Sequence, residues 1–187
     1  MKRILIPLFA LAILLIGCVQ DGSSVEKQAS RAIRALKRGD MQTLSQLVHP
    51  AKGVRFTPVT YVNTGRNIFF YAKDLPDAME DDTIHRWGEY DGTGDPIQLT
   101  FKMYYEDFLY DHDYAKAKQV TWNQKMEHGS LIDNTLDVYP NTEVVEYYFP
   151  GFEEKYGGLD WVSLRLVWEE LDSSWYLVGI IHDQWSP

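Results

Sequence analysis

Residues 161–185, WVSLRLVWEELDSSWYLVGIIHDQW, contain the pattern that decides the fold. Apolar and other residues alternate through 161–171, as expected of a β-strand with one face in a core. The residues that share the apolar face are Val162, Leu164, Leu166 and Trp168. The polar stretch 172–174 is typical of a tight turn, and 175–185 is apolar again. The stretch therefore predicts an antiparallel hairpin at the end of the chain.

The sequence before this hairpin predicts helices first and more strands later. Helical spacing of apolar residues, with capping residues at the ends, predicts helices over 24–38, 41–49 and 101–110. Strands are expected at 53–56 and 118–126, and a second hairpin at 133–149 with its turn at Pro140-Asn141. Residues 60–98 show no clear period, apart from the turn-like YDGTGDP at 90–96.

This order of elements resembles the NTF2-like fold, a cystatin-like cone found in many small bacterial proteins. The resemblance covers residues 24–187 and implies an α+β fold. Its N-terminal helices would pack in a strongly bent, mostly antiparallel sheet. The phrases EYYFPGF, DWVSLRLVWEE and WYLVGIIHDQW are also similar to phrases of uncharacterised bacterial lipoproteins. That likeness implies no activity.

The N-terminus has the features of a secretory signal peptide. Lys2 and Arg3 precede ILIPLFALAILLIG, an uncharged run of 14 residues that is short for a membrane span. The run ends in Leu15-Ile16-Gly17-Cys18, which resembles the lipobox of bacterial lipoproteins. The resemblance implies cleavage before Cys18 and attachment of lipid to its sulfur. Two or more acyl chains would hold the protein stably at a membrane.

We therefore predict a signal peptide at 1–17, a lipidated tether at 18–23 and one domain at 24–187. The remaining 170 residues suffice for one core. Loss of Lys2 and Arg3 with the signal peptide changes the net charge from −9 to −11. So acidic a chain argues against nucleic acid as a partner, because phosphates would be repelled. The expected location is the extracytoplasmic face of a cell membrane.

Three polar residues of the strands are candidates for proton transfer or anion binding: His182, Arg165 and Glu146. His182 and Asp183 are adjacent on a strand and point to opposite faces, so a partner for His182 must come from elsewhere. Arg165 points away from Leu164. It would bind a carboxylate or phosphate on a concave face, or form a cross-strand ion pair on an outer face. A structural histidine at a strand end is the simpler interpretation of His182.

Four aspartates in polar stretches are candidate ligands for Ca²⁺: Asp91, Asp95, Asp111 and Asp113. Neither stretch has EF-hand spacing, and a tight turn accounts for the first one. The motifs HExxH and GxSxG, a phosphate-binding loop and paired cysteines are all absent from the sequence. We expect no cofactor.

The sequence thus predicts a lipid-anchored protein of the cell envelope that binds a small ligand or another envelope protein without catalysis. One alternative is an enzyme that acts on a small molecule inside the cone. The other is a Ca²⁺-binding envelope protein. Aromatic residues such as those of EYYF and SWYLV could line a pocket, although aromatic residues at strand spacing more often form a core.

Overall fold

A computed structural model describes residues 24–124 and 132–185. The predicted signal peptide, the tether and Cys18 lie outside the described residues. The elements, in chain order, are α1 (Val25–Arg38), α2 (Met41–Ser45), β1 (Val54–Thr57), β2 (Phe69–Phe70), η1 (Ala72–Asp74), η2 (Ala78–Glu80), β3 (His85–Glu89), β4 (Pro96–Leu99), α3 (Phe101–Tyr104), η3 (Tyr105–Leu109), η4 (Tyr114–Lys116), β5 (Gln119–Trp122), α4 (Thr135–Val138), β6 (Thr142–Phe149), η5 (Glu154–Tyr156), β7 (Val162–Leu171) and β8 (Ser174–Gln184).

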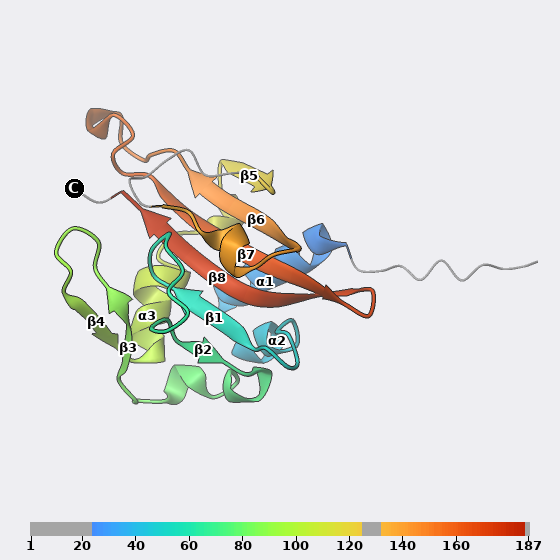
Figure 1. Ribbon diagram of the computed structural model, residues 1–187. Helices are drawn as coiled ribbons and strands as arrows, with labels where there is room; N and C mark the ends of the chain where they lie inside the picture. The colour runs from blue at the N-terminus through green and yellow to red at the C-terminus, as the bar shows by residue number, and fades with distance from the viewer. Residues whose placement is uncertain (1–23, 125–131, 186–187) are drawn as a thin grey trace, which may run out of the picture.

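The fold is a mixed α+β fold with a curled sheet of six strands, in the order β2-β1-β8-β7-β6-β5 (Figure 1). The predicted hairpin is its centre: β7 and β8 pair antiparallel from Val162–Gln184 to Leu171–Ser174. Asp172 and Ser173 both have positive φ, as a two-residue hairpin turn requires. Strand β1 pairs with β8 in parallel, and the other pairings in this sheet are antiparallel. Strands β3 and β4 form a separate hairpin.

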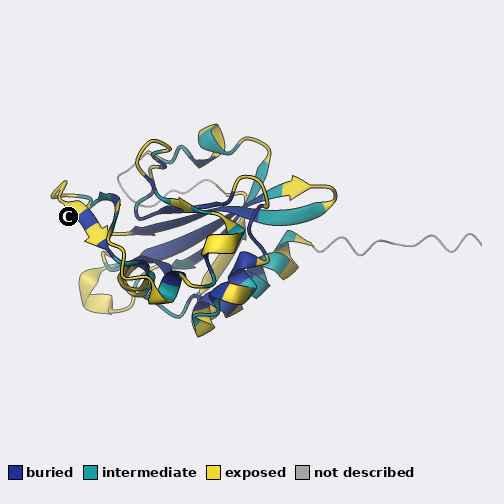
Figure 2. Cartoon of the chain, turned by 90° about the horizontal axis from the view of Figure 1, so that it is seen from below, coloured by how far each residue is buried: buried dark blue, intermediate teal, exposed yellow. Residues whose placement is uncertain are grey.

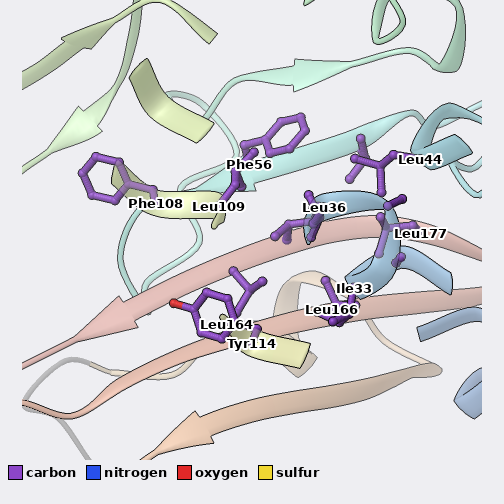
Figure 3. Close-up of a cluster of buried hydrophobic side chains, with 14 of the residues drawn as sticks. Ile33, Leu36, Leu44, Phe56, Phe108, Leu109, Tyr114, Leu164, Leu166 and Leu177 are labelled. Carbon is purple, nitrogen blue, oxygen red and sulfur yellow. The ribbon is translucent and has the colours of Figure 1, made fainter. Parts of the chain in front are cut away.

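Helix α1 is set by its sequence at both ends. The Ser24 side chain accepts a hydrogen bond from the Lys27 backbone N–H, and Gly39 ends the helix in the left-handed conformation. Between them, the apolar stripe that contains Ile33 and Leu36 is buried. These side chains point toward Leu166 and Leu177 of the sheet (Figure 3).

The core lies between one face of the sheet and helices α1, α2 and α3. Phe56, Trp87, Tyr104, Leu164 and Trp168 are each 0% exposed in it. Rings stack closely here: the centroids of Trp87 and Tyr104 are 3.8 Å apart. Burial is concentrated on the central strands and on the inner side of α1 (Figure 2). We call this side of the sheet the core face, and the opposite side the outer face.

The second predicted hairpin, 133–149, is wrong in its first half, which is not a strand. Residues Thr135–Val138 form the short helix α4, and β6 pairs with β7 and β5 instead. The Asp133 carboxylate accepts a hydrogen bond from the Thr135 N–H, which favours a helical start over an extended strand. In Figure 1, α4 lies in front of β7 and β8 while α1 passes behind them, so α4 covers part of the outer face.

Several boundaries also differ from the predictions. Helix α2 ends at Ser45, because the chain then makes a bridge from Val48 to Leu177 of β8. The predicted helix 101–110 is present, but η3 completes it as a π-helical turn. Strand β5 covers Gln119–Trp122 of the predicted 118–126, of which residues 125–126 lie outside the described residues. The unassigned stretch 60–98 contains β2, two 3-10 turns and the β3–β4 hairpin.

Candidate ligand-binding site

The three strand residues singled out in the sequence lie on opposite faces of the sheet. His182 is opposite Leu164 on the core face. Arg165 is opposite Glu146 of β6 and Ile181 of β8, on the outer face. The sheet therefore separates His182 from the other two, and one shared site cannot contain all three.

His182 is completely buried and does find a partner elsewhere in the chain. Its Nε2 lies 3.4 Å from an Asp111 carboxylate oxygen, and its Nδ1 lies 3.3 Å from the Pro58 carbonyl oxygen. Asp111 also accepts a hydrogen bond from the Tyr114 hydroxyl and contacts His112 at 2.7 Å. Burial raises the pKa of Asp111, but its bonds with His112 and His182 outweigh that effect and hold the pKa well below its usual range.

The core side of His182 offers little room for a substrate. Phe108 packs edge-on against the ring at 5.3 Å between centroids. A cavity of about 50 Å³ lies near the end of β8, lined by Phe108, Pro58 and Asp183, and its lining does not include His182. Such a cavity holds one or two water molecules, since each occupies about 30 Å³. The His182–Asp111 pair thus ties β8 to the segment after α3.

Arg165 is the central residue of the outer face. It is only 2% exposed, although it carries a permanent charge. Its Nη1 donates to an Asp133 carboxylate oxygen at 2.8 Å and to the Thr135 hydroxyl at 3.1 Å. Burial raises the pKa of Asp133, but the Arg165 charge and the bonds from Thr135 outweigh it and lower that pKa. The outer-face alternative for Arg165 is therefore the one observed, but its ion-pair partner is Asp133, from the loop before α4.

Two further donors of Arg165, its Nε and Nη2, have no hydrogen-bond partner among the described residues. The Ser163 hydroxyl on the same face lacks one as well. A buried donor without an acceptor costs about 1–3 kcal/mol. The outer face therefore contains polar groups that the described part of the protein does not satisfy.

A pocket of about 310 Å³ adjoins Arg165. Its lining includes Asp133, Thr135, Leu136, Asp137, Val144 and Arg165. Helix α4 is held over the sheet beside it, because the Asn134 side chain makes hydrogen bonds to both the N–H and the carbonyl of Val62. The pocket thus combines a buried guanidinium, carboxylates and two apolar side chains.

Asp183 adds to the polar character of the outer face. It accepts a hydrogen bond from the Thr60 hydroxyl. Burial raises its pKa above the ordinary value, although the Thr60 bond and the Arg165 charge oppose that shift.

The four candidate Ca²⁺ ligands do not come together. Asp91 and Asp95 belong to the β3–β4 turn, where Asp91 accepts a bond from the Gly92 N–H. Asp113 binds Lys37 of α1 at 2.7 Å. Within residues 24–124 and 132–185, no three His, Cys, Asp or Glu side chains gather closely enough to hold a metal ion.

Two larger pockets lie at the described surface. One, of about 530 Å³, separates the loop around Tyr61 from the β3–β4 turn, and its charged residues Arg66 and Glu89 already form an exposed ion pair. The other, of about 350 Å³, lies near Arg55 and Tyr139. Neither contains a buried charged side chain with free donors, as the Arg165 pocket does.

Sequence reasoning missed Asp133 and Thr135, which fix Arg165, and it did not pair Asp111 with His182. One signal was available: an arginine in an otherwise apolar strand requires a nearby carboxylate. The sequence did not show which of its many carboxylates this would be.

Comparison with known proteins gives a weak structural likeness only. No protein-family model matches the sequence, and no curated protein is similar enough to count as a relative. The chain is similar to a DUF4783 family protein from Bacteroides ovatus, at 11% identity and a TM-score of 0.37, over 84% of this chain and 94% of that one. It is also similar to an NTF-2 like protein of unknown function from Shewanella oneidensis, at 10% identity and a TM-score of 0.36, over 86% and 96%. These likenesses assign neither a function nor a site residue.

Proposed function

We propose that this chain is a membrane-anchored lipoprotein of the cell envelope, and that its NTF2-like domain is a non-catalytic binding module for a small ligand. The ligand binds in the Arg165 pocket. The observation that carries the proposal is a guanidinium that is 2% exposed, lines a pocket and has two donors without partners among the described residues. Such a group binds an acceptor strongly, because the donors have already lost their water.

The packing on the other side of the sheet favours binding over catalysis. An enzyme of the cone class would need open space between the sheet and its helices. Large side chains such as Phe56, Phe101 and Tyr104 fill that space. His182, the best general base by chemistry, is 0% exposed, with Phe108 packed against its ring.

Anchoring is proposed from the lipobox at Leu15–Cys18. Among the described residues, no helix has the length and apolarity needed to cross a membrane. The lipid on Cys18 would then bind the protein to the membrane. Helix α1 begins at Val25, only a few positions after Cys18 in the sequence. In cells, Cys18→Ser should leave an unprocessed precursor without lipid. Normal maturation of that variant would end the lipoprotein proposal.

The binding proposal is tested by thermal unfolding with a panel of small polar molecules. A ligand that binds only the folded state raises the melting temperature, and the rise increases with the logarithm of ligand concentration once that exceeds the Kd. We expect the raised melting temperature to be lost in Arg165→Lys and kept in Arg66→Lys, a matched change at an exposed arginine. Molecules that stabilise Arg165→Lys as much as the parent protein would show that the site lies elsewhere.

A further inference from the structure

We propose that the Arg165 pocket takes a zwitterionic amino acid with an aliphatic side chain, of about the size of leucine. This inference rests on the proposed binding function and names its ligand class. Three properties of the pocket carry it: the free edge of Arg165, an excess of carboxylates, and apolar lining at the mouth.

The free donors of Arg165 define one end of the ligand. Nε and Nη2 form one edge of the planar guanidinium, and their N–H groups point the same way. Two parallel donors match the two oxygens of a carboxylate. Nη1, at the other end of the guanidinium, is already occupied by Asp133 and Thr135. Nε and Nη2 have almost no exposed surface, so the pocket lining shifts to admit a carboxylate. The carboxylate then completes the hydrogen bonding of Arg165, while Nη1 keeps its contacts to Asp133 and Thr135.

The surrounding charges define the second group on the ligand. Among residues 24–124 and 132–185, three acidic groups face Arg165 from neighbouring elements: Asp133 before α4, Glu146 on β6 and Asp183 on β8. Asp137 adds a further carboxylate to the pocket lining. A ligand with only negative charge would be repelled by this excess. An ammonium group beside the carboxylate removes the net charge and gives Asp137 a partner.

The apolar lining defines the remainder. Leu136 is 61% exposed and lines the pocket together with Val144, which is buried. An exposed leucine beside a buried valine offers contact to a short aliphatic chain. The volume of about 310 Å³ is large enough for a single amino acid.

The test uses isothermal titration of the purified protein with three probes of the same shape. L-leucine carries both charged groups, 4-methylpentanoate lacks the ammonium, and 3-methylbutylamine lacks the carboxylate. We expect leucine to bind at least about tenfold more tightly than either analogue, because each loses a charge-assisted interaction. Arg165→Lys should weaken leucine binding by a similar factor, since lysine cannot make the bidentate contact.

A second variant, at an exposed residue, separates an effect on binding from an effect on folding. Asp137 is exposed, so Asp137→Asn should leave stability unchanged and still weaken leucine several-fold. Its control is Asp95→Asn, an exposed change in the β3–β4 turn that should leave binding unchanged.

Two results would overturn the inference. If 4-methylpentanoate binds as tightly as leucine and still depends on Arg165, the zwitterion is wrong while the binding function stands. If none of the three probes gives heat of binding, the ligand class is wrong. The binding function itself then fails only if the wider panel also yields no molecule that depends on Arg165.

Discussion

Removing the charge of Asp133 should destabilise the protein far more than removing both members of its pair with Arg165. The two side chains are 16% and 2% exposed, so the pair is largely withdrawn from water. Breaking a buried pair by removing one partner costs about 3–5 kcal/mol, because the remaining charge is buried without compensation. Asp133 retains some contact with water, so we expect Asp133→Asn to lie at the lower end, at about 3 kcal/mol.

The double variant Arg165→Met/Asp133→Asn should recover most of that loss. Methionine has a similar shape and no charge, and it also removes the two donors that lack partners. Replacing both members of a buried ion pair by uncharged groups is often neutral or stabilising. We therefore expect the double variant to lie within about 1 kcal/mol of the parent protein.

The assay is urea unfolding followed by tryptophan fluorescence. For an m-value of about 2 kcal/mol per molar urea, a loss of about 3 kcal/mol lowers the midpoint by about 1.5 M. The single variants and the double variant together form a thermodynamic cycle. If the losses in free energy of unfolding of Asp133→Asn and Arg165→Met simply add in the double variant, the two side chains are not coupled. The buried ion pair on the outer face would then be wrong.

Three further predictions concern the core, a turn and the histidine pair. Leu36→Ala in α1 should cost about 2–5 kcal/mol by urea unfolding, because it opens a cavity at a fully buried site, whereas Lys27→Ala on the exposed side should change little. Gly53→Ala should lower the melting temperature by the equivalent of about 1–3 kcal/mol, because φ is +72° and the new Cβ would lie 2.5 Å from a backbone oxygen of β2; an unchanged melting temperature would refute it. Asp111→Asn should cost about 1–3 kcal/mol at pH 7 through its lost bond to His182. Folding lowers the pKa of Asp111, so its contribution to the free energy of unfolding is complete above the ordinary pKa of 3.8 and is lost as the pH falls below that value. The difference in free energy of unfolding between the variant and the parent protein should therefore be smaller in urea titrations at pH 3 than at pH 7.

The parts of the fold with a strong period were predictable from sequence. The 161–185 hairpin has alternation in its first strand and a polar turn, and α1 has an apolar stripe between a serine cap and Gly39. Helix α4 was not predictable, because four residues are too few to show a period. The β3–β4 hairpin was missed because the segment 60–98 packs its apolar side chains against α3 and β1. Tertiary contacts of this kind do not require a regular spacing of apolar residues in the sequence.

The candidate site was only half predictable. The sequence marks Arg165 as a candidate for anion binding or for a cross-strand ion pair, but it does not show on which face the residue lies. Asp133 lies 32 positions before it, in a stretch that resembled the start of a strand. The partner of His182 is likewise 71 positions away. Contacts over such separations depend on the arrangement of whole elements, and local pattern does not contain that information.

The most direct test of the binding site is the NMR signal of the Arg165 Nε–H group during titration with L-leucine. The proposed site predicts that this signal shifts with leucine concentration and saturates, while the indole signals of Trp87 and Trp168 in the core stay in place. An unmoved Arg165 signal, with shifts confined to the core, would contradict the outer-face site and return attention to the interior of the fold.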